Sequence, residues 1–372
     1  MRVLFLDQFS ELGGAQRVLL DTVCAARERG WSVRVALPGN GPLVDQLRSS
    51  GFPIVPIACG PYRSGSKSLG DLLRFSSDLR QQRRVIGALA SETDLIYVNG
   101  PRLLPAAALV SRGRIPILFH AHSHVHGLAR RMACGSIRRS RATVIACSQS
   151  VLDVFREGSR AGAVMPNGIA EIPFRERHGI SRIGIIGRIH PDKGQLEFVR
   201  AASLLHSEFP GLQFIICGAP QFSDSAYLRS VKELAQGLPV EFLGWRDDIG
   251  AVLSELDLLV VPSKQEGMGR VIVEAFSAGV PVLASAVGGI PEIIEDGVNG
   301  YLMRERSPDA MAQRITQIVG SDPAPLRRLA ANARRDWERS YNLTLYQQRV
   351  TQVMACLSRQ SAHETEELPL HK

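Results

Sequence analysis

The stretch Arg182-Ile-Gly-Ile-Ile-Gly-Arg-Ile-His-Pro-Asp-Lys-Gly-Gln-Leu-Glu-Phe-Val-Arg-Ala-Ala-Ser-Leu-Leu205 decides the fold class. Its first five residues are largely apolar, as in a parallel strand that is covered on both faces. Its last eleven residues carry apolar side chains at helical spacing. The loop between them contains two glycines and a proline, which favour a turn. A strand, a short loop and a helix in this order predict an α/β fold with a parallel sheet.

The same alternation of apolar runs and longer helical segments continues outward on both sides. In the first half, strands are expected at Val3–Leu6, Val33–Leu37, Ile54–Ile57, Leu95–Val98, Ile117–His120, Thr143–Cys147 and Ala163–Met165. In the second half, they are expected at Arg182–Ile186, Gln213–Cys217, Val240–Leu243, Leu258–Val261 and Val282–Ala284. Two series of this kind predict two Rossmann-like, doubly wound domains.

The length of 372 residues suits two domains better than one. A polar, irregular segment at 170–181 separates the two series of strands, so we expect one domain at 1–170 and a second at 171–340. A C-terminal helix is expected at 341–359, packing back toward the first domain, with a disordered tail at 360–372. Ligands of open α/β sheets bind outside the carboxyl ends of the strands, so a cleft is expected between two facing sheets.

Charge and hydrophobicity exclude several classes of protein. The formal net charge is +8, and no apolar run approaches the roughly 20 residues that span a bilayer. The apolar stretch at the N-terminus ends at Asp7, too early for a signal peptide, so a cytoplasmic location is expected. The six cysteines are scattered, which favours free thiols over disulfides or a zinc site.

The segment from Leu95 to Leu152 has no acidic residue. It carries eight arginines, which are Arg102, Arg112, Arg114, Arg130, Arg131, Arg138, Arg139 and Arg141. Such a one-signed region attracts anions. An anionic membrane surface, an anionic acceptor molecule and nucleic acid are candidate partners, and simple solubility is the alternative. Nucleic acid is the least favoured, because no aromatic platform or recognition motif accompanies the charge.

The strongest chemical motif is Glu266-Gly-Met-Gly-Arg-Val-Ile-Val-Glu274, which follows the expected strand at Leu258–Val261. The glycines allow close approach of the backbone to a ligand, and the N-terminus of the following helix favours phosphate. The two carboxylates lie about two turns apart and are suited to accept hydrogen bonds from hydroxyl groups. Taken alone, the motif is equally consistent with two solvent-facing glutamates on a surface helix.

A second motif, the loop Gly187–Gly194, places Arg188 and Lys193 beside another helix start. Fixed cations at such a place stabilise the charge that develops on a leaving diphosphate. Four histidines alternate along the segment that begins at the last residue of the expected strand Ile117–His120. They are His120, His122, His124 and His126. With no cysteine or carboxylate beside them, a metal site is not expected there.

With these motifs in this order, the sequence resembles the GT-B-fold retaining glycosyltransferases, the large group with two glutamates in the donor site. Gly13-Gly14-Ala15, Pro166-Asn-Gly-Ile169, Leu243-Gly-Trp245 and Gly288-Gly-Ile-Pro-Glu292 resemble further segments of that group. The family usually has an apolar residue at the position of Arg270. That side chain is expected either to reach a phosphate or to point to solvent.

The resemblance implies a role for each matched residue. Glu266 would bind the hydroxyls of the donor sugar and Glu274 those of the ribose, and Arg188 and Lys193 would hold the diphosphate. Gly267 and the amides of Met268 and Gly269 would add contacts, and Gly14 would let the first domain approach the donor or acceptor. A histidine after the fifth expected strand would face the sugar, with His122 preferred and His120 as the alternative. No metal or other cofactor is implied.

The function expected on this basis is the transfer of a sugar, with retention of configuration, from a nucleoside-diphosphate sugar to a lipid-linked or cell-envelope glycan. The basic segment that contains Arg130, Arg131, Arg138, Arg139 and Arg141 would meet the acceptor or an anionic membrane surface, making the protein peripheral on the inner face of the membrane. A non-catalytic nucleotide-sugar-binding relative and an epimerase of the same fold are the alternatives. A dinucleotide-dependent oxidoreductase would need a glycine fingerprint that the sequence lacks.

Overall fold

The structure, a computed structural model, describes residues 1–60, 69–159, 161–220 and 225–360. Its contacts divide the chain into two compact units. The first unit contains Met1–Asn167 together with the chain from Thr344, and the second contains Gly168–Leu343. The predicted tail at 360–372 lies outside the described residues except for its first residue.

The first unit is built on a parallel sheet of seven strands in the order β3-β2-β1-β4-β5-β6-β7. The strands are β1 (Arg2–Asp7), β2 (Ser32–Leu37), β3 (Ile54–Pro56), β4 (Leu95–Asn99), β5 (Ile117–Ala121), β6 (Thr143–Ala146) and β7 (Gly162–Val164). Every residue of β4 and β5 is buried, which is why their sequences are apolar rather than alternating. The direction of winding reverses between β1 and β4, the position at which such sheets bind ligands.

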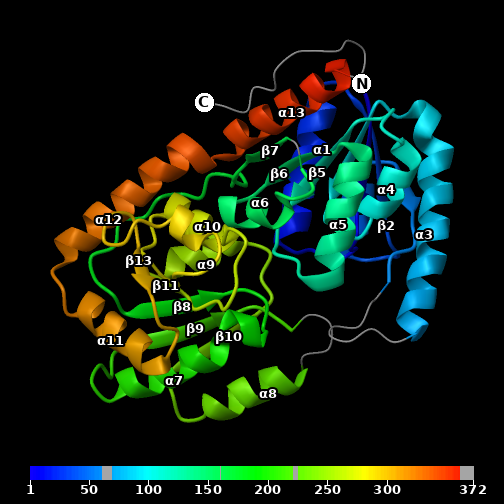
Figure 1. The fold of residues 1–372 in the computed structure, drawn as a ribbon. Coiled ribbons are helices and arrows are strands. Elements are labelled where there is room, and N and C mark those ends of the chain that lie inside the picture. The colour runs from blue at the N-terminus through cyan, green and yellow to red at the C-terminus, as the bar shows by residue number, and fades with distance from the viewer. Residues whose placement is uncertain (61–68, 160, 221–224, 361–372) are drawn as a thin grey trace. The chain divides into compact units, whose positions relative to one another are not determined.

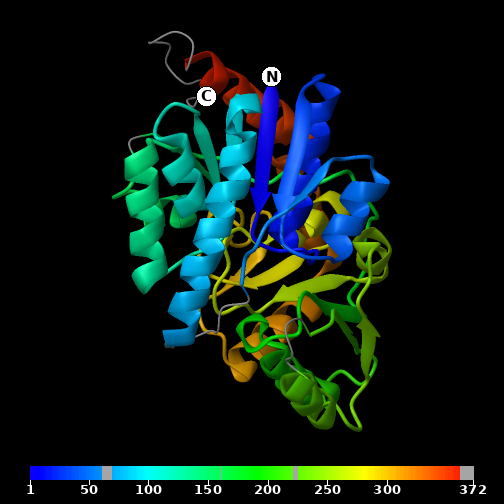
Figure 2. The ribbon, with the colours of Figure 1, turned by 90° about the vertical axis from the view of Figure 1, so that its right-hand side faces the viewer.

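Seven helices accompany this sheet within the described residues. They are α1 (Gly14–Glu28), α2 (Pro42–Ser49), α3 (Leu69–Leu89), α4 (Leu104–Ser111), α5 (Gly127–Ser140), α6 (Gln149–Phe155) and α13 (Leu343–Gln360). Helices α3, α4 and α5 pack in a row, and α3 stands in front of the sheet in Figure 2. Helix α13 returns beside α1 (Figure 1), where the Tyr346 hydroxyl lies 2.7 Å from the Thr22 hydroxyl.

The second unit repeats the design with six parallel strands in the order β10-β9-β8-β11-β12-β13. The strands are β8 (Arg182–Ile186), β9 (Gln213–Cys217), β10 (Val240–Gly244), β11 (Leu258–Val261), β12 (Val282–Ser285) and β13 (Tyr301–Met303). The helices are α7 (Gln195–His206), α8 (Ser225–Leu234), α9 (Ile249–Glu255), α10 (Arg270–Ala278), α11 (Pro308–Val319) and α12 (Pro323–Asp336). Its winding reverses between β8 and β11.

The predicted fold class, two doubly wound α/β domains, is confirmed. That the sheets face each other across a cleft stays a prediction. Strand β13 was not predicted. Asp248 caps α9, since its Oδ1 accepts a hydrogen bond of 3.0 Å from the Ala251 amide. Among the described residues, no helix combines the length and the apolar character needed to cross a bilayer.

Candidate functional site

In the second unit, the two predicted motifs meet at the carboxyl ends of β8 and β11. The Lys193 ammonium lies 2.6 Å from Glu266 Oε2, although the two residues are 73 positions apart in the sequence. The Lys193 side chain is 28% exposed and that of Glu266 is 16% exposed, so the ion pair is largely shielded from water. A backbone hydrogen bond of 2.7 Å from the Lys264 amide to the Asp192 carbonyl joins the same two loops.

Glycines allow these loops to approach so closely. At Gly194, a Cβ would lie 2.5 Å from the Pro262 carbonyl oxygen, and the backbone has φ +80°. At Gly288, after β12, a Cβ would lie 1.9 Å from the Glu266 carbonyl oxygen, with φ +55°. Any larger residue would force the loops apart. The two glycines therefore hold the backbone of Glu266 against the loops that follow β8 and β12.

Arg188 lies in the same group of loops and is half-buried. Within the part of the chain that the structure describes, its guanidinium has no hydrogen-bond or ion-pair partner. A shielded guanidinium gains from an anion that offers paired acceptors. The loop after β8 can therefore receive a diphosphate at Arg188, beside the Lys193–Glu266 pair.

The glycine loop Gly267–Gly269 leads directly into α10. Met268 is buried, and Gly269 at the N-cap has φ +81°. The first backbone N–H groups of a helix have no partner within the helix and favour an anion. Of the two alternatives for Arg270, the solvent-facing one is wrong, because its Nε donates to Glu274 Oε1 at 3.1 Å and its side chain is only 19% exposed. Arg270 therefore holds the Glu274 carboxylate in place on α10.

In the first unit, polar side chains gather at the carboxyl ends of β1, β4 and β5. Asp7 is fully buried, and its Oδ2 accepts a hydrogen bond of 2.5 Å from Asn99 Nδ2. Burial raises the pKa of Asp7 to about 7, although hydrogen bonds from Asn99, the Phe9 amide and Gln16 act in the opposite direction. His122 lies just beyond β5, and its Nε2 is 2.7 Å from Asn99 Oδ1.

The structure separates the two histidine candidates. His120 is fully buried on β5, and its Nδ1 lies 2.5 Å from the Tyr97 hydroxyl. Burial, followed by the neighbouring His122, lowers the pKa of His120 well below its ordinary value. The ring of His122 lies against that of His120, with centroids 3.9 Å apart and the ring planes tilted by 41°, and is half-buried. His120 is thus part of the core, which leaves His122 as the candidate to meet a substrate.

Two further residues of this unit differ in their surroundings. His124 is half-buried, and its Nε2 lies 2.8 Å from the Ser150 hydroxyl on α6. Gly14, the first residue of α1, is exposed, and a Cβ there would meet no atom within 4 Å. The surroundings of Gly14 in the described structure therefore do not require a glycine, and its predicted role depends on a bound molecule.

The basic segment forms α5, but its apolar residues do not share one exposed face. Ile137 is buried in the core of the first unit, so it cannot enter a membrane. Arg130 forms an ion pair of 2.9 Å with Glu157, and Arg138 donates to the Glu157 carbonyl, which ties α5 to the end of α6. The exposed stripe contains Leu128, Arg131, Gly135, Arg138 and Arg139, with Arg141 just after the helix.

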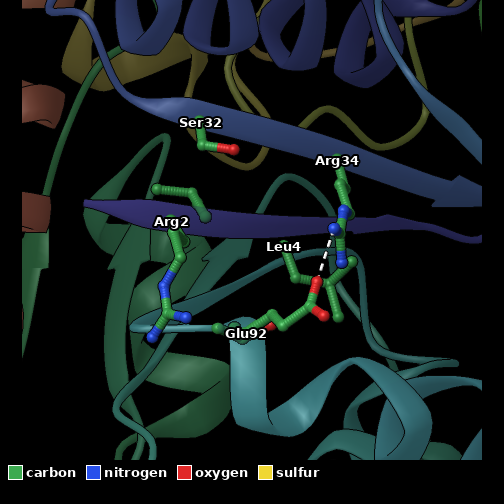
Figure 3. A pocket seen from close by; sticks show the side chains of 7 residues that line it. Arg2, Leu4, Ser32, Arg34 and Glu92 are labelled. Carbon is green, nitrogen blue, oxygen red and sulfur yellow. Dashed lines mark ion pairs between the residues drawn. The ribbon is translucent and has the colours of Figure 1, made fainter.

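Asp7 and Asn99 were not predicted as site residues. The available signal was a polar residue that ends each of the two apolar strands beside the reversal of the sheet. A separate small cavity at the amino ends of β1 and β2 is lined by Arg2, Leu4, Ser32, Arg34 and Glu92, and includes none of the predicted residues (Figure 3). In the described ranges, no cluster of three or more histidine, cysteine or acidic side chains is arranged to hold a metal ion.

Comparison with known proteins gives a family model for each half of the chain. The model described as Glycosyltransferase Family 4 matches residues 12–171, and the model described as Glycosyl transferases group 1 matches residues 180–321. The D-inositol 3-phosphate glycosyltransferase of Mycolicibacterium gilvum is 36% identical over 156 residues, which are 40% of this chain and 34% of that protein. The corresponding enzyme of Mycolicibacterium smegmatis is 34% identical over 48% of this chain and 40% of its own length. The match thus spans well under half the length of these curated relatives.

Similarity to a solved structure extends further. The crystal structure of HepE from Anabaena, in complex with UDP and glucose, matches with a TM-score of 0.80 and 27% identity. This match covers 95% of the present chain and 99% of that one. Sucrose-phosphate synthase from Thermosynechococcus elongatus shares the fold at a TM-score of 0.78 and 21% identity. With one family model on each half and this fold over nearly its whole length, the chain belongs to the group 1 glycosyltransferases of GT-B fold.

Proposed function

We propose that the protein transfers a sugar from a nucleoside-diphosphate sugar to a hydroxyl group of an acceptor. The observation that carries this proposal is the half-buried residue Arg188, which lies in the same loop as Lys193 of the Lys193–Glu266 pair, at the carboxyl ends of β8 and β11. A diphosphate gains negative charge as its bond to the sugar breaks. Cations already fixed around it stabilise that charge without reorganisation.

The same loops supply groups for the rest of the donor. Glu266 accepts from sugar hydroxyls, and Glu274, held by Arg270, accepts from the ribose. Gly267 and the start of α10, with Met268 and Gly269, offer backbone N–H groups to the phosphates. We propose a UDP-sugar as the donor, because HepE has been crystallised with UDP and with UDP-glucose.

His122 and Gly14 stand at the corresponding edge of the first unit, where β1 and β5 end. We assign His122 the contact with the donor sugar and Gly14 a close backbone approach to the donor or acceptor. Transfer proceeds with retention of configuration. The leaving diphosphate takes the proton of the acceptor hydroxyl on the same face of the sugar. The reaction needs no metal, so a chelator such as EDTA leaves the rate unchanged.

The direct test incubates the protein with a panel of nucleotide sugars and measures release of the nucleoside diphosphate, with and without acceptor. Calorimetry with UDP then tests the site. Lys193→Ala and Glu274→Ala each weaken UDP binding roughly ten- to a hundredfold, since a charge-assisted contact contributes about 1.5–3 kcal/mol. His122→Ala leaves UDP affinity nearly unchanged. Equal affinity in wild type and both donor-loop variants rules out this site.

The acceptor is proposed to carry negative charge, as a phosphate-bearing small molecule or a lipid-linked glycan at a membrane surface. The curated relatives are named for D-inositol 3-phosphate, an anion. The exposed stripe of α5 presents Arg131, Arg139 and Arg141 around a half-exposed Leu128. Each arginine near an anionic lipid surface contributes about 1 kcal/mol before screening by salt.

Vesicle sedimentation tests membrane binding. Wild-type protein should sediment with anionic vesicles at low salt, less at high salt, and less again when Arg131, Arg139 and Arg141 are changed to serine. Arg130 and Arg138 stay in place in this variant, because both tie α5 to Glu157. Wild-type protein that stays in the supernatant with anionic vesicles points instead to a soluble anionic acceptor.

Two other functions use the same site. An epimerase would convert one nucleotide sugar into another without acceptor, and a non-catalytic relative would bind UDP and release nothing from any donor. The intact set of Arg188, Lys193, Glu266 and Glu274 favours catalysis over binding alone.

A further inference from the structure

A continuous line of hydrogen bonds connects a buried carboxylate to His122. Asp7 at the end of β1 bonds to Asn99 at the end of β4, and Asn99 bonds to the ring of His122 after β5. The heavy-atom distances are 2.5 Å and 2.7 Å. The first contact joins residues 92 positions apart and the second joins residues 23 apart. Three neighbouring strand ends thus meet through their side chains.

The direction of each hydrogen bond follows from its partners. Asp7 Oδ1 accepts from the Phe9 amide at 2.8 Å and from Gln16 Nε2 at 3.1 Å. Its Oδ2 accepts from Asn99, whose amide nitrogen must therefore face Asp7. The amide oxygen of Asn99 then faces His122, and an oxygen can only accept. His122 must carry its proton on Nε2.

We propose that Asp7 and Asn99 are positioning residues that fix the ring orientation and the Nε2–H tautomer of His122. The inference rests on the proposed function for the role of His122 in transfer. In this tautomer the lone pair of the neutral ring lies on Nδ1, an atom that is buried in the described structure. The opposite tautomer would place an N–H at that buried position and turn a lone pair toward Asn99.

The surroundings support a role beyond packing. Asp7 is fully buried, and within the described residues no cationic side chain bonds to its carboxylate. A buried carboxylate without a cation lowers the stability of the folded protein. If the residue at position 7 served only to fill space, an apolar side chain would give a more stable fold. Beneath His122, the rings of His120 and Tyr346 lie nearly parallel, with centroids 6.3 Å apart. This layer supports the His122 ring from the side of the core.

The variant Asp7→Asn tests the proposal because it should exchange the donor and acceptor in each hydrogen bond from residue 7 through Asn99 to His122. The fixed Phe9 amide keeps an oxygen at the position of Oδ1, so the new amide nitrogen takes the position of Oδ2. Two amide nitrogens would then face each other, and we expect Asn99 to flip, which gives up the hydrogen bond of 3.1 Å from its Nδ2 to the Ala15 carbonyl. Its own nitrogen would then donate to His122 Nε2 and move the ring proton to Nδ1.

The tautomer is read directly by long-range ¹H–¹⁵N NMR of histidine-labelled protein at pH 8, with His122→Gln to assign the signal among nine histidines. We expect Nε2–H in the wild type and Nδ1–H in Asp7→Asn. In transfer assays kcat should fall roughly ten- to a hundredfold in this variant, while KM for the donor changes less than about threefold. An unchanged tautomer in Asp7→Asn overturns the proposal.

Two further variants sharpen the test. The swap Asp7→Asn with Asn99→Asp restores an acceptor against His122 and should return the ring to Nε2–H with most of the lost kcat. Gln16→Leu is the matched control, because Gln16 bonds to the same carboxylate but stands outside the line to His122. Gln16→Leu should keep both the tautomer and the rate.

If Asp7→Asn shows no cooperative melting, the swap decides, and an Nδ1–H ring there overturns the proposal. A wild type that transfers no sugar from any donor overturns the proposed function instead. The NMR result still decides whether Asp7 and Asn99 set the tautomer.

Discussion

At the scale of single residues, the molecule keeps buried charge at the strand ends where substrates of this fold bind. Asp7 shows the cost, because burial raises its pKa to about 7 from an ordinary value of 3.8. A folded-state pKa above the unfolded value means that folding is favoured by the protonated form. That contribution is fully present below pH 3.8 and is lost as the pH rises through 7.

Asp7→Asn should therefore gain stability relative to the wild type as the pH rises from about 4 to about 8. A pKa difference of this size corresponds to up to about 4 kcal/mol. Urea denaturation of both proteins across this range measures it. A difference in unfolding free energy that does not change with pH would show that Asp7 titrates normally in the folded protein.

At the scale of loops and helices, glycine contacts position the residues of the proposed donor site. Gly288 and Gly297 both have positive φ, +55° and +77°, but only at Gly288 would a Cβ meet the Glu266 carbonyl oxygen. Gly297 has no atom within 4 Å of the same position. Substitutions at these two glycines therefore distinguish the effect of backbone strain, expected at both, from the effect of displacing Glu266, expected only at Gly288.

Gly297→Ala should cost about 1–2 kcal/mol of stability from its left-handed backbone and leave UDP affinity unchanged. Gly288→Ala should cost more and weaken UDP binding at least about tenfold, because the loop that carries Glu266 must move. Thermal melts and UDP titrations measure the two effects. Unchanged UDP affinity in Gly288→Ala would mean that the position of Glu266 does not matter for the nucleotide.

At the scale of the whole molecule, the chain passes from the first unit to the second after Asn167 and returns at Thr344. The segment that follows the first passage is bound along the second unit. The buried Arg177 donates to the carbonyls of Leu253, Leu256 and Ala278, at the ends of α9 and α10. Desolvation lowers the pKa of Arg177 to about 10, so it stays charged at neutral pH.

Arg177→Ala should destabilise the second unit by about 3 kcal/mol or more, because several buried carbonyls lose their donor. It should also expose residues 168–179 to limited proteolysis. Arg175→Ala is the control, since the exposed Arg175 side chain bonds to the Ser254 carbonyl at the surface and should contribute about 1 kcal/mol or less. Equal melting temperatures for the two variants would contradict this role of Arg177.

Local sequence by itself determined the elements of this protein. The apolar runs predicted both parallel sheets because strands covered on two faces must be apolar, and this holds for all of β4, β5, β11 and β12. The two loops with Lys193 and Glu266 were predictable because glycines and helix starts are encoded by neighbouring residues. Strand β13 was missed, although β3 and β7, which are equally short, were predicted.

Only the tertiary structure decided which side chains meet. The line from Asp7 through Asn99 to His122 depends on β1, β4 and β5 lying side by side, an order set by packing between distant parts of the chain. The same holds for Ile137, which lies among the arginines of α5 in the sequence and is buried in the core of the first unit. Local patterns specify backbone conformation, whereas the face that is buried and the partner across a sheet depend on contacts that span tens of residues.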